Sequence, residues 1–217
     1  MPGTIAEDIE IIDAGRGGGT GTPAGGDDES GSPGARRPIP TRAYFTALQL
    51  GLAAIVMFFM ALASSYIVRK GLGTDWQRTP MPPVVWFNTA ILLFSSITIT
   101  VARRKLENGP REAFQTWWWL TTGLGLLFLA GQIIAWRGLA AAGMLLSTNP
   151  SSSFFYLLTA AHGAHLAGGI FALFYVMFRN WKRSRISQKT AADLTSIYWH
   201  FMDGLWVFLL VLLTLGR

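Results

Sequence analysis

Three histidines and one acid inside an apolar run are the side chains of this sequence best suited to metal or proton chemistry. His162 and His165 lie three residues apart, and so do His200 and Asp203. Residues three apart lie on the same face of a helix, and side chains at this spacing bind metals in some helical bundles. The two pairs belong to different apolar runs, and no glutamate lies inside such a run. We therefore interpret the histidines as hydrogen-bonded structural groups rather than as metal ligands.

The composition excludes several kinds of redox centre. The 217-residue chain contains three histidines and no cysteine. A bis-histidine haem beside a haem–copper site needs more histidines than this, and a dinuclear copper centre needs thiolates. The glycines near the N-terminus lack the Lys-Ser pair of a phosphate-binding loop. The chain is therefore expected to hold no metal or cofactor of its own.

The apolar pattern places the four residues in membrane-spanning helices. Hydrophobic residues make up 51% of the chain and charged residues 14%, whereas soluble domains carry about 25% charged residues. Apolar runs of about 20 residues recur, which is the length that crosses a hydrocarbon core. A lone strand would leave its backbone unpaired in lipid. The sequence therefore predicts an all-α integral membrane bundle of five transmembrane helices, at about residues 44–68, 84–102, 114–136, 153–178 and 196–215.

The first 40 residues differ from the rest of the chain. Residues 1–40 are rich in Gly and Pro, contain Asp and Glu, and have too little apolar surface to fold, so we predict a disordered tail there and the membrane domain over 41–217. The net charge is +6, but the basic residues lie in short loops between apolar runs, so nucleic acid is not an expected partner. Their excess on one side predicts a cytoplasmic N-terminus and a C-terminus outside the cell.

Asp203 is expected about 10 Å deep in the membrane, because it follows the cytoplasmic start of its span by about seven residues and a helix rises about 1.5 Å per residue. Gln49, Ser95 and Ser96 are expected at a similar depth. A charged group at the centre of a membrane helix costs about 2.5–3.5 kcal/mol on insertion scales, so it usually has a partner or a function. The sequence predicts a polar cluster in the inner half of the bundle, in which Asp203 and His200 tie helices together or handle protons.

Small residues on the fourth span predict a close helix contact. Gly163, Ala164, Ala167 and Gly168 supply small side chains four residues apart. This spacing allows a neighbouring helix to approach closely and is common in membrane bundles. It indicates packing rather than chemistry.

The last span opens with a pattern that is typical of one family. Residues 198–206 read YWHFMDGLW, which resembles the YWHFVDxxW signature of cytochrome c oxidase subunit III. Residues 154–169 read FFYLLTAAHGAHLAGG and resemble the FFxLTGxHGxHVxGG segment of the same family. Other motifs of the family match in order between about residues 48 and 215, among them Pro82-Pro83, Trp86, Asn88, Gln132 and Trp136.

The resemblance implies the shorter, five-helix form of the family, in a bacterial plasma membrane. It implies a supporting subunit that packs against oxidase subunits I and II, which hold the haem and copper. The complex would reduce oxygen to water with proton pumping, and this chain would sustain proton uptake and bind phospholipid between its helices. The complex could also join a respiratory supercomplex.

The resemblance also implies which polar residues lie at helix interfaces. Two positions depart from the family, which often has Glu where this chain has Ile55 and Ala135. Any role of those carboxylates in proton handling or lipid contact is therefore not carried over. The predicted interface residues are His162, His165, His200, Asp203, Trp86, Asn88, Gln132 and Trp199.

Two alternative functions remain open from the sequence. The chain could be a related accessory protein of a nitric oxide reductase, or a small transporter that uses Asp203 and the histidines as a proton-coupled site. No inverted repeat is visible between the halves of the sequence. No pair of spans broken by Gly or Pro is visible either, which disfavours the transporter.

Overall fold

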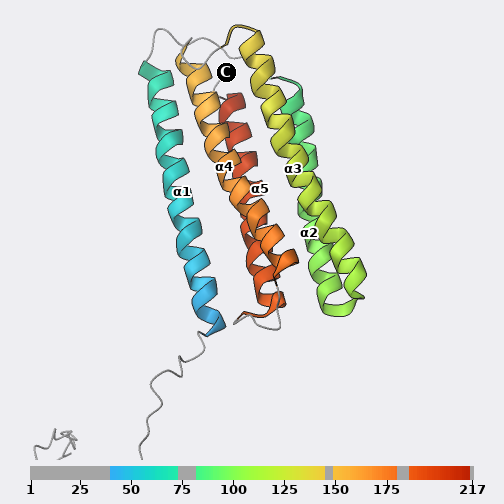
Figure 1. The fold of residues 1–217 in the computed structure, drawn as a ribbon. Helices are drawn as coiled ribbons and strands as arrows, with labels where there is room; N and C mark the ends of the chain where they lie inside the picture. The colour runs from blue at the N-terminus through green and yellow to red at the C-terminus, as the bar shows by residue number, and fades with distance from the viewer. Residues whose placement is uncertain (1–39, 73–81, 145–148, 180–185, 216–217) are drawn as a thin grey trace, which may run out of the picture. The chain divides into compact units, whose positions relative to one another are not determined.

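The computed structural model describes residues 40–72, 82–144, 149–179 and 186–215. Except for Pro40, the tail predicted for residues 1–40 lies outside these ranges. The described residues form five helices that run alternately in opposite directions (Figure 1). The helices are α1 (Thr41–Leu72), α2 (Val84–Asn108), α3 (Arg111–Ala141), α4 (Pro150–Phe178) and α5 (Gln188–Leu215).

All five described helices are long and apolar enough to cross a membrane, which confirms the predicted all-α membrane bundle. We call the end at which α1 begins the inner end, and the opposite end the outer end. Two helices run well past their predicted spans at the inner end, by six and eight residues. α2 continues to Asn108 instead of ending at 102, and α5 begins at Gln188 instead of 196. Charged residues end an apolar run without ending a helix, because Lys, Arg and Glu are good helix formers.

Two ion pairs join the inner extensions of α2 and α5. Arg103 Nη2 lies 2.7 Å from Asp193 Oδ1, and Lys189 Nζ lies 2.9 Å from Glu107 Oε1. The hydrogen bond from Lys189, together with its charge, lowers the pKa of Glu107, and Glu107 raises the pKa of Lys189 in return. Water and salt screen this exposed pair, so it contributes little to stability.

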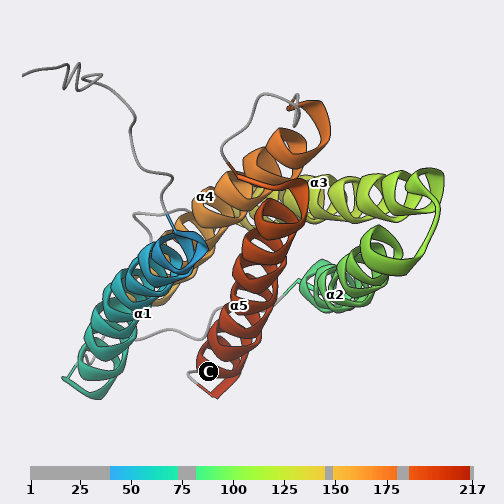
Figure 2. The same cartoon turned by 90° about the horizontal axis from the view of Figure 1, so that it is seen from below.

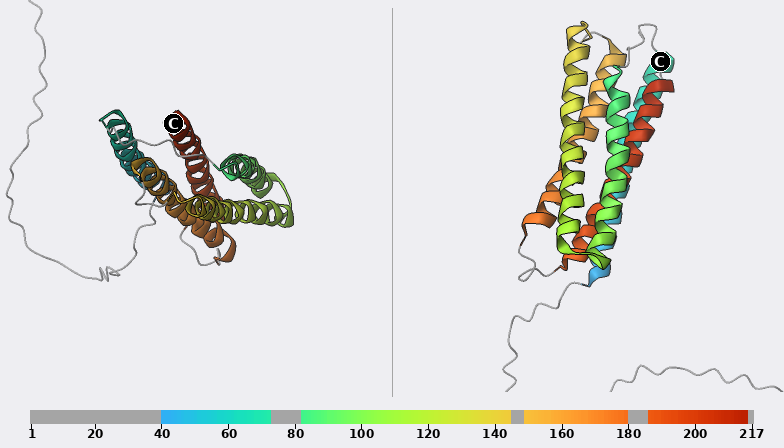
Figure 3. Two further views of the ribbon diagram at one scale, coloured as in Figure 1. Left: turned by 90° about the horizontal axis from the view of Figure 1, so that it is seen from above. Right: turned by 90° about the vertical axis from the view of Figure 1, so that its right-hand side faces the viewer.

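α5 lies at the centre of the bundle, in contact with α1, α2 and α4. α2 packs along α3, α3 packs on α4, and α1 packs on α4 and α5. Seen along the helix axes, α1 and the α2–α3 pair lie on opposite sides of α4 and α5 (Figures 2 and 3). α1 is the least enclosed helix, and its buried side chains are Phe59, Ala63 and Tyr66.

Three fully buried tryptophans form the centre of the core. Trp118, Trp199 and Trp206 are each at most 1% exposed. A buried N–H is costly unless it finds an acceptor, and each of the three indoles donates to a helix other than its own. Trp118 donates to the carbonyl of Leu173 at 3.0 Å. The indoles of Trp199 and Trp206 donate to hydroxyls of α2, as described below.

Glycines on two helices make room for the Trp199 indole. A Cβ at Gly125 of α3 would lie 2.6 Å from Trp199 Cη2, and one at Gly169 of α4 would lie 3.3 Å from Cε3 and Cζ3 on another edge of the same six-membered ring. At Gly163 and Gly168, where the sequence predicts close approach, a Cβ would make ordinary contacts at 3.8 Å. The indole therefore requires glycine at Gly125 and Gly169, whereas Gly163 and Gly168 face no such close neighbour.

Candidate functional site

The inner half of the bundle contains a group of four polar side chains, Ser96, Thr100, His200 and Asp203, which we call the inner cluster. His200 Nδ1 lies 2.6 Å from Ser96 Oγ, and His200 Nε2 lies 3.2 Å from Thr100 Oγ1. One ring nitrogen of a neutral histidine donates and the other accepts, and a hydroxyl can do either. His200 therefore links α5 to two successive turns of α2.

Asp203 lies one helical turn after His200 and is 4% exposed. Neither of its carboxylate oxygens has a hydrogen-bond partner in the part of the chain that the structure describes. The Ser96 hydroxyl lies beside the carboxyl group, but its hydrogen bond goes to His200. Gln49, predicted at the same depth, is exposed on α1. The structure thus brings Ser96, His200 and Asp203 together and leaves Gln49 outside the cluster.

Polar contacts between α2 and α5 continue beyond the inner cluster in both directions. Trp199 Nε1 donates to Ser95 Oγ at 2.9 Å, and Trp206 Nε1 donates to Thr89 Oγ1 at 3.0 Å. From residue 89 to residue 103 the α2 helix rises about 21 Å, so these contacts cover most of a hydrocarbon core. We call this series the α2–α5 seam; its pairs are Arg103–Asp193, Thr100–His200, Ser96–His200, Ser95–Trp199 and Thr89–Trp206.

The outer half of the bundle contains a second polar group, Asn88, Gln132 and His162, which we call the outer cluster. These side chains come from α2, α3 and α4 and are 1%, 2% and 0% exposed. Asn88 Nδ2 donates to the carbonyl of Phe128 at 3.4 Å. The His162 ring lies against the rings of Phe128 and Trp206, with centroids 5.9 and 5.0 Å apart. Asn88 and His162 thus share Phe128 as a neighbour.

The two histidines of α4 face different helices. His162 faces α3 and α5, whereas the His165 ring lies against Phe58 and Phe59 of α1, at centroid distances of 6.0 and 5.5 Å. His165 Nδ1 lies 2.8 Å from the carbonyl of Ala161 in its own helix. Within the described ranges no three His, Cys, Asp or Glu side chains come together. The structure places His162 and His165 in separate surroundings.

The two tryptophans among the predicted interface residues differ in burial. Trp199 is fully buried at the centre of the core, whereas Trp86 is 56% exposed on α2. Ile55 is partly buried against the core, and Ala135 is 1% exposed. Both departures from the family pattern thus place an apolar side chain inside the bundle.

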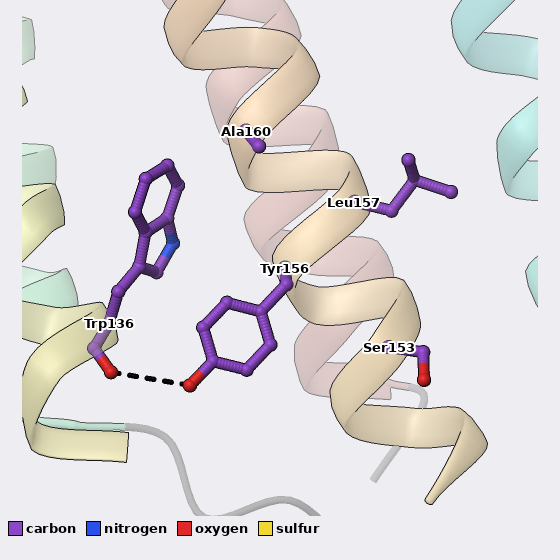
Figure 4. A pocket seen from close by; sticks show the side chains of 5 residues that line it. All are labelled: Trp136, Ser153, Tyr156, Leu157 and Ala160. Atoms are coloured by element: carbon purple, nitrogen blue, oxygen red, sulfur yellow. Dashed lines mark hydrogen bonds between the residues drawn. The ribbon is translucent and has the colours of Figure 1, made fainter. Parts of the chain in front are cut away.

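An apolar groove lies on the outer half of α3 and α4 (Figure 4). Its volume is about 490 Å³. Tyr156 Oη donates to the carbonyls of Trp136 and Met144, at 3.2 and 3.0 Å, and Trp136 Nε1 donates to Thr159 Oγ1 at 3.0 Å. The polar atoms of both aromatic side chains are therefore engaged within the protein, and the groove presents hydrocarbon. Its lining residues are Trp136, Ser153, Tyr156, Leu157 and Ala160.

Comparison with known proteins decides the family. A family model described as cytochrome c oxidase subunit III matches residues 44–215, a range that includes the inner cluster, the outer cluster and the groove. The chain belongs to the cytochrome c oxidase subunit III family. This confirms the resemblance seen in the sequence motifs.

Individual subunit III relatives align over most of the chain. The cytochrome c oxidase subunit 3 of Synechocystis sp. is 28% identical over 172 residues, which cover 76% of this chain and 72% of the relative. The probable cytochrome c oxidase subunit 3 of Mycobacterium tuberculosis is 31% identical over 165 residues, covering 72% and 79%. The cytochrome c oxidase subunit 3 of Bacillus sp. PS3 is 31% identical over 169 residues, covering 76% and 82%.

Sequence reasoning missed the hydroxyls that accept the indole N–H groups. Thr89 and Thr159 accept from Trp206 and Trp136, and the pairs come from different helices. A single sequence shows which residues could pair but not which turns of two helices face each other. A tryptophan buried in a membrane bundle needs an acceptor for its N–H. This requirement could have indicated that hydroxyls on neighbouring helices accept from these indoles.

Proposed function

We propose that this chain is the non-redox subunit III of a respiratory haem–copper oxidase that reduces oxygen to water with proton pumping. The observation that carries the proposal is the subunit III match over residues 44–215, which extends from the first to the last described helix. Haem and copper belong to partner subunits I and II, because this chain has three histidines and no cysteine. No finding favours the nitric oxide reductase accessory or the transporter.

The subunit lies in a bacterial plasma membrane with its inner end toward the cytoplasm. Positive residues concentrate on the cytoplasmic side of membrane proteins. In the described ranges the inner end carries more of them than the outer end, where Arg69, Lys70 and Arg137 lie. The basic residues of the inner end are Arg42, Arg103, Arg104, Lys105, Arg111, Arg179 and Lys189.

The proposed role is support of the catalytic subunit during proton uptake. The α2–α5 seam ties two helices together through most of the apolar thickness, which favours a rigid wall for a neighbouring subunit. The inner cluster holds a histidine and a carboxyl group close to the cytoplasmic side, where pumped and consumed protons enter. A buried ionisable residue in a membrane helix is by default a functional group, so we assign proton exchange to His200 and Asp203.

The oxidase assignment is tested by purification of the tagged chain from its native membranes in mild detergent. The expected product is a complex that contains haem and copper and reduces oxygen. The chain separated from that complex should show no haem absorption and no bound copper. Stoichiometric haem on the separated chain, or a complex that reduces nitric oxide and not oxygen, would overturn the assignment.

Replacing Asp203 with asparagine is expected to leave the fold intact and to slow proton uptake. Asparagine has the shape of aspartate but does not titrate, and the carboxylate makes no hydrogen bond within the described residues that the amide would lose. A relay group outside the active site has less effect than the roughly 10²-fold of a catalytic acid or base, so we expect uptake about two- to tenfold slower. Dye-detected proton uptake by the purified complex measures this.

The matched control is Ser196→Ala, which removes a buried polar atom of α5 that also has no partner in the described part of the chain. It should leave proton uptake unchanged. If Asp203→Asn instead lowers retention of the chain in the complex, with uptake per complex unchanged, Asp203 is a structural brace and the proton role is wrong.

The apolar groove of α3 and α4 supports the proposal that the subunit binds phospholipid. The groove presents hydrocarbon at the outer end of the bundle, beside aromatic side chains of the kind that lie at membrane interfaces. We assign it to an acyl chain of a lipid in the outer leaflet. Ala160→Trp would fill the groove and is expected to remove about one bound phospholipid per complex, as counted by native mass spectrometry.

The control for the groove is Ala61→Trp, because Ala61 is exposed on α1, and α1 does not line the groove. The same bulky side chain there should leave the lipid count unchanged. Equal counts for Ala160→Trp and the unmodified chain would contradict the assignment of the groove.

A further inference from the structure

The outer cluster concentrates unpartnered polar atoms at one depth of the bundle. Asn88 Oδ1, both polar atoms of the Gln132 amide and both ring nitrogens of His162 have no hydrogen-bond partner in the described ranges. All three side chains are at most 2% exposed. Buried polar groups in native proteins nearly always have a partner, from the protein or from ordered water.

The register of the helices brings the three side chains to the same level. The Trp136–Thr159 hydrogen bond joins α3 to α4, and these helices run in opposite directions (Figure 1). Moving one turn back along α3 reaches Gln132, and moving one turn forward along α4 reaches His162. Asn88 bonds to the carbonyl of Phe128, which lies one turn before Gln132. The three groups thus surround one region.

The chemistry of these atoms selects the ligand. Each amide brings an acceptor oxygen and a donor NH₂ group, and a neutral histidine brings one donor and one acceptor. A bare cation satisfies only acceptors, and an anion satisfies only donors. Water both donates and accepts, so it matches the mixed set.

Small residues lie near Gln132 on α3, at Gly131 and Ala135. Ala135 is one turn further along α3 and is 1% exposed, so a single methyl group lies at this buried position. Gly131 precedes Gln132 and lies so close to Asn88 that a Cβ there would collide with the amide oxygen. The hydrogen bond to Phe128 holds Asn88 toward α3. The lack of a side chain at Gly131 leaves room for the Asn88 amide.

We propose that Asn88, Gln132 and His162 bind ordered water molecules that join α2, α3 and α4 in the outer half of the bundle. A buried water makes about three hydrogen bonds, so the five unpartnered atoms call for about two waters. The site is independent of the proposed oxidase role, because it concerns the packing of this chain alone.

The test uses the full chain in lipid nanodiscs and apolar replacements of similar shape, Asn88→Leu and Gln132→Met. If water joins the two residues, each replacement should lower the Tm by about 2–4 °C. The double variant should lose less than the sum, because both residues act through the same waters. Leu139→Met is the control, since Leu139 is 2% exposed on the same helix and carries no polar group.

A rise in Tm on either apolar replacement would overturn the proposal, because it would show that the polar atoms are unsatisfied in the native protein. A density map of the unmodified complex at a resolution that shows waters decides the case independently of how the variants fold. Density that bridges the three side chains supports the proposal. Direct contact between Gln132 and His162, with no density between the three groups, overturns it.

Discussion

Gly125→Val is expected to destabilise the bundle by roughly 2–6 kcal/mol, which combines the cost of overpacking a core with that of an orphaned hydrogen-bond donor. A Cβ at this position would lie 2.6 Å from Trp199 Cη2. The indole has little freedom to move away, because Gly169 packs on another edge of the same six-membered ring and the indole N–H donates to Ser95. If the indole shifts, that N–H loses its acceptor in the core. Thermal unfolding of the chain in nanodiscs measures the loss.

Gly123→Val provides a close control for this prediction. Gly123 lies on the same helix two residues earlier, is exposed, and has no atom within 4 Å of an added Cβ. The propensity cost of valine in the helix is the same at both positions, so the difference in Tm isolates the contact with Trp199. In the double variant Gly125→Val/Trp199→Leu, leucine replaces the larger indole and removes the collision, so part of the loss in stability should be recovered. Equal Tm values for the two single variants would show that the indole adjusts freely.

The second large effect is expected when α2 loses the two hydroxyls that accept hydrogen bonds from the indoles of α5. Thr89→Val and Ser95→Ala would leave the N–H groups of Trp206 and Trp199 buried without these acceptors. An orphaned buried donor costs about 1–3 kcal/mol, so the double variant should lose roughly 2–6 kcal/mol. The two sites are about 9 Å apart along α2, so their effects should add.

Thr98→Val separates the cost of an orphaned donor from the cost of losing any hydroxyl. Thr98 bonds to Thr121 at 2.8 Å, but the Thr121 hydroxyl also donates to the carbonyl of Trp117 at 3.0 Å. No donor is therefore orphaned when Thr98 loses its hydroxyl. Chemical or thermal unfolding should show a clearly smaller loss for Thr98→Val than for Ser95→Ala. Equal losses would mean that the indole hydrogen bonds of the α2–α5 seam contribute no more to stability than other buried hydroxyl contacts.

The elements of this fold could be predicted from the sequence because lipid imposes a simple rule. Every backbone polar group in the hydrocarbon core must pair within its own segment, so each long apolar run becomes a helix. The extensions at Asn108 and Gln188 were missed, since hydropathy marks where lipid ends and not where helical hydrogen bonding ends. Both extensions contain ion pairs between α2 and α5, which depend on how the helices pack.

The depth of the polar side chains in the membrane could be predicted from the sequence, but not which neighbouring helix each side chain faces. Depth follows from the helical rise, and it placed Ser96, His200 and Asp203 at one level. The rotation of each helix about its axis depends on the whole set of packed side chains. This is why Gln49, predicted at the same depth, lies exposed on α1 and outside the inner cluster. It is also why His162 and His165 are separated, although they are three residues apart.

The contacts of α1 determine when during biosynthesis the bundle can close. Among the five described helices α1 is synthesised first, but it packs on α4 and α5, the fourth and fifth of them. Lys70 Nζ donates to the carbonyl of Leu215 at 3.2 Å, across 145 residues of sequence. After insertion α1 must therefore remain in the lipid without its final neighbours until α4 and α5 have been synthesised. During that interval α2 and α3, which pack along each other, can already pair. The last event of folding is thus the capture of the first helix made, and a chaperone or a partner subunit that shields α1 would act in that interval.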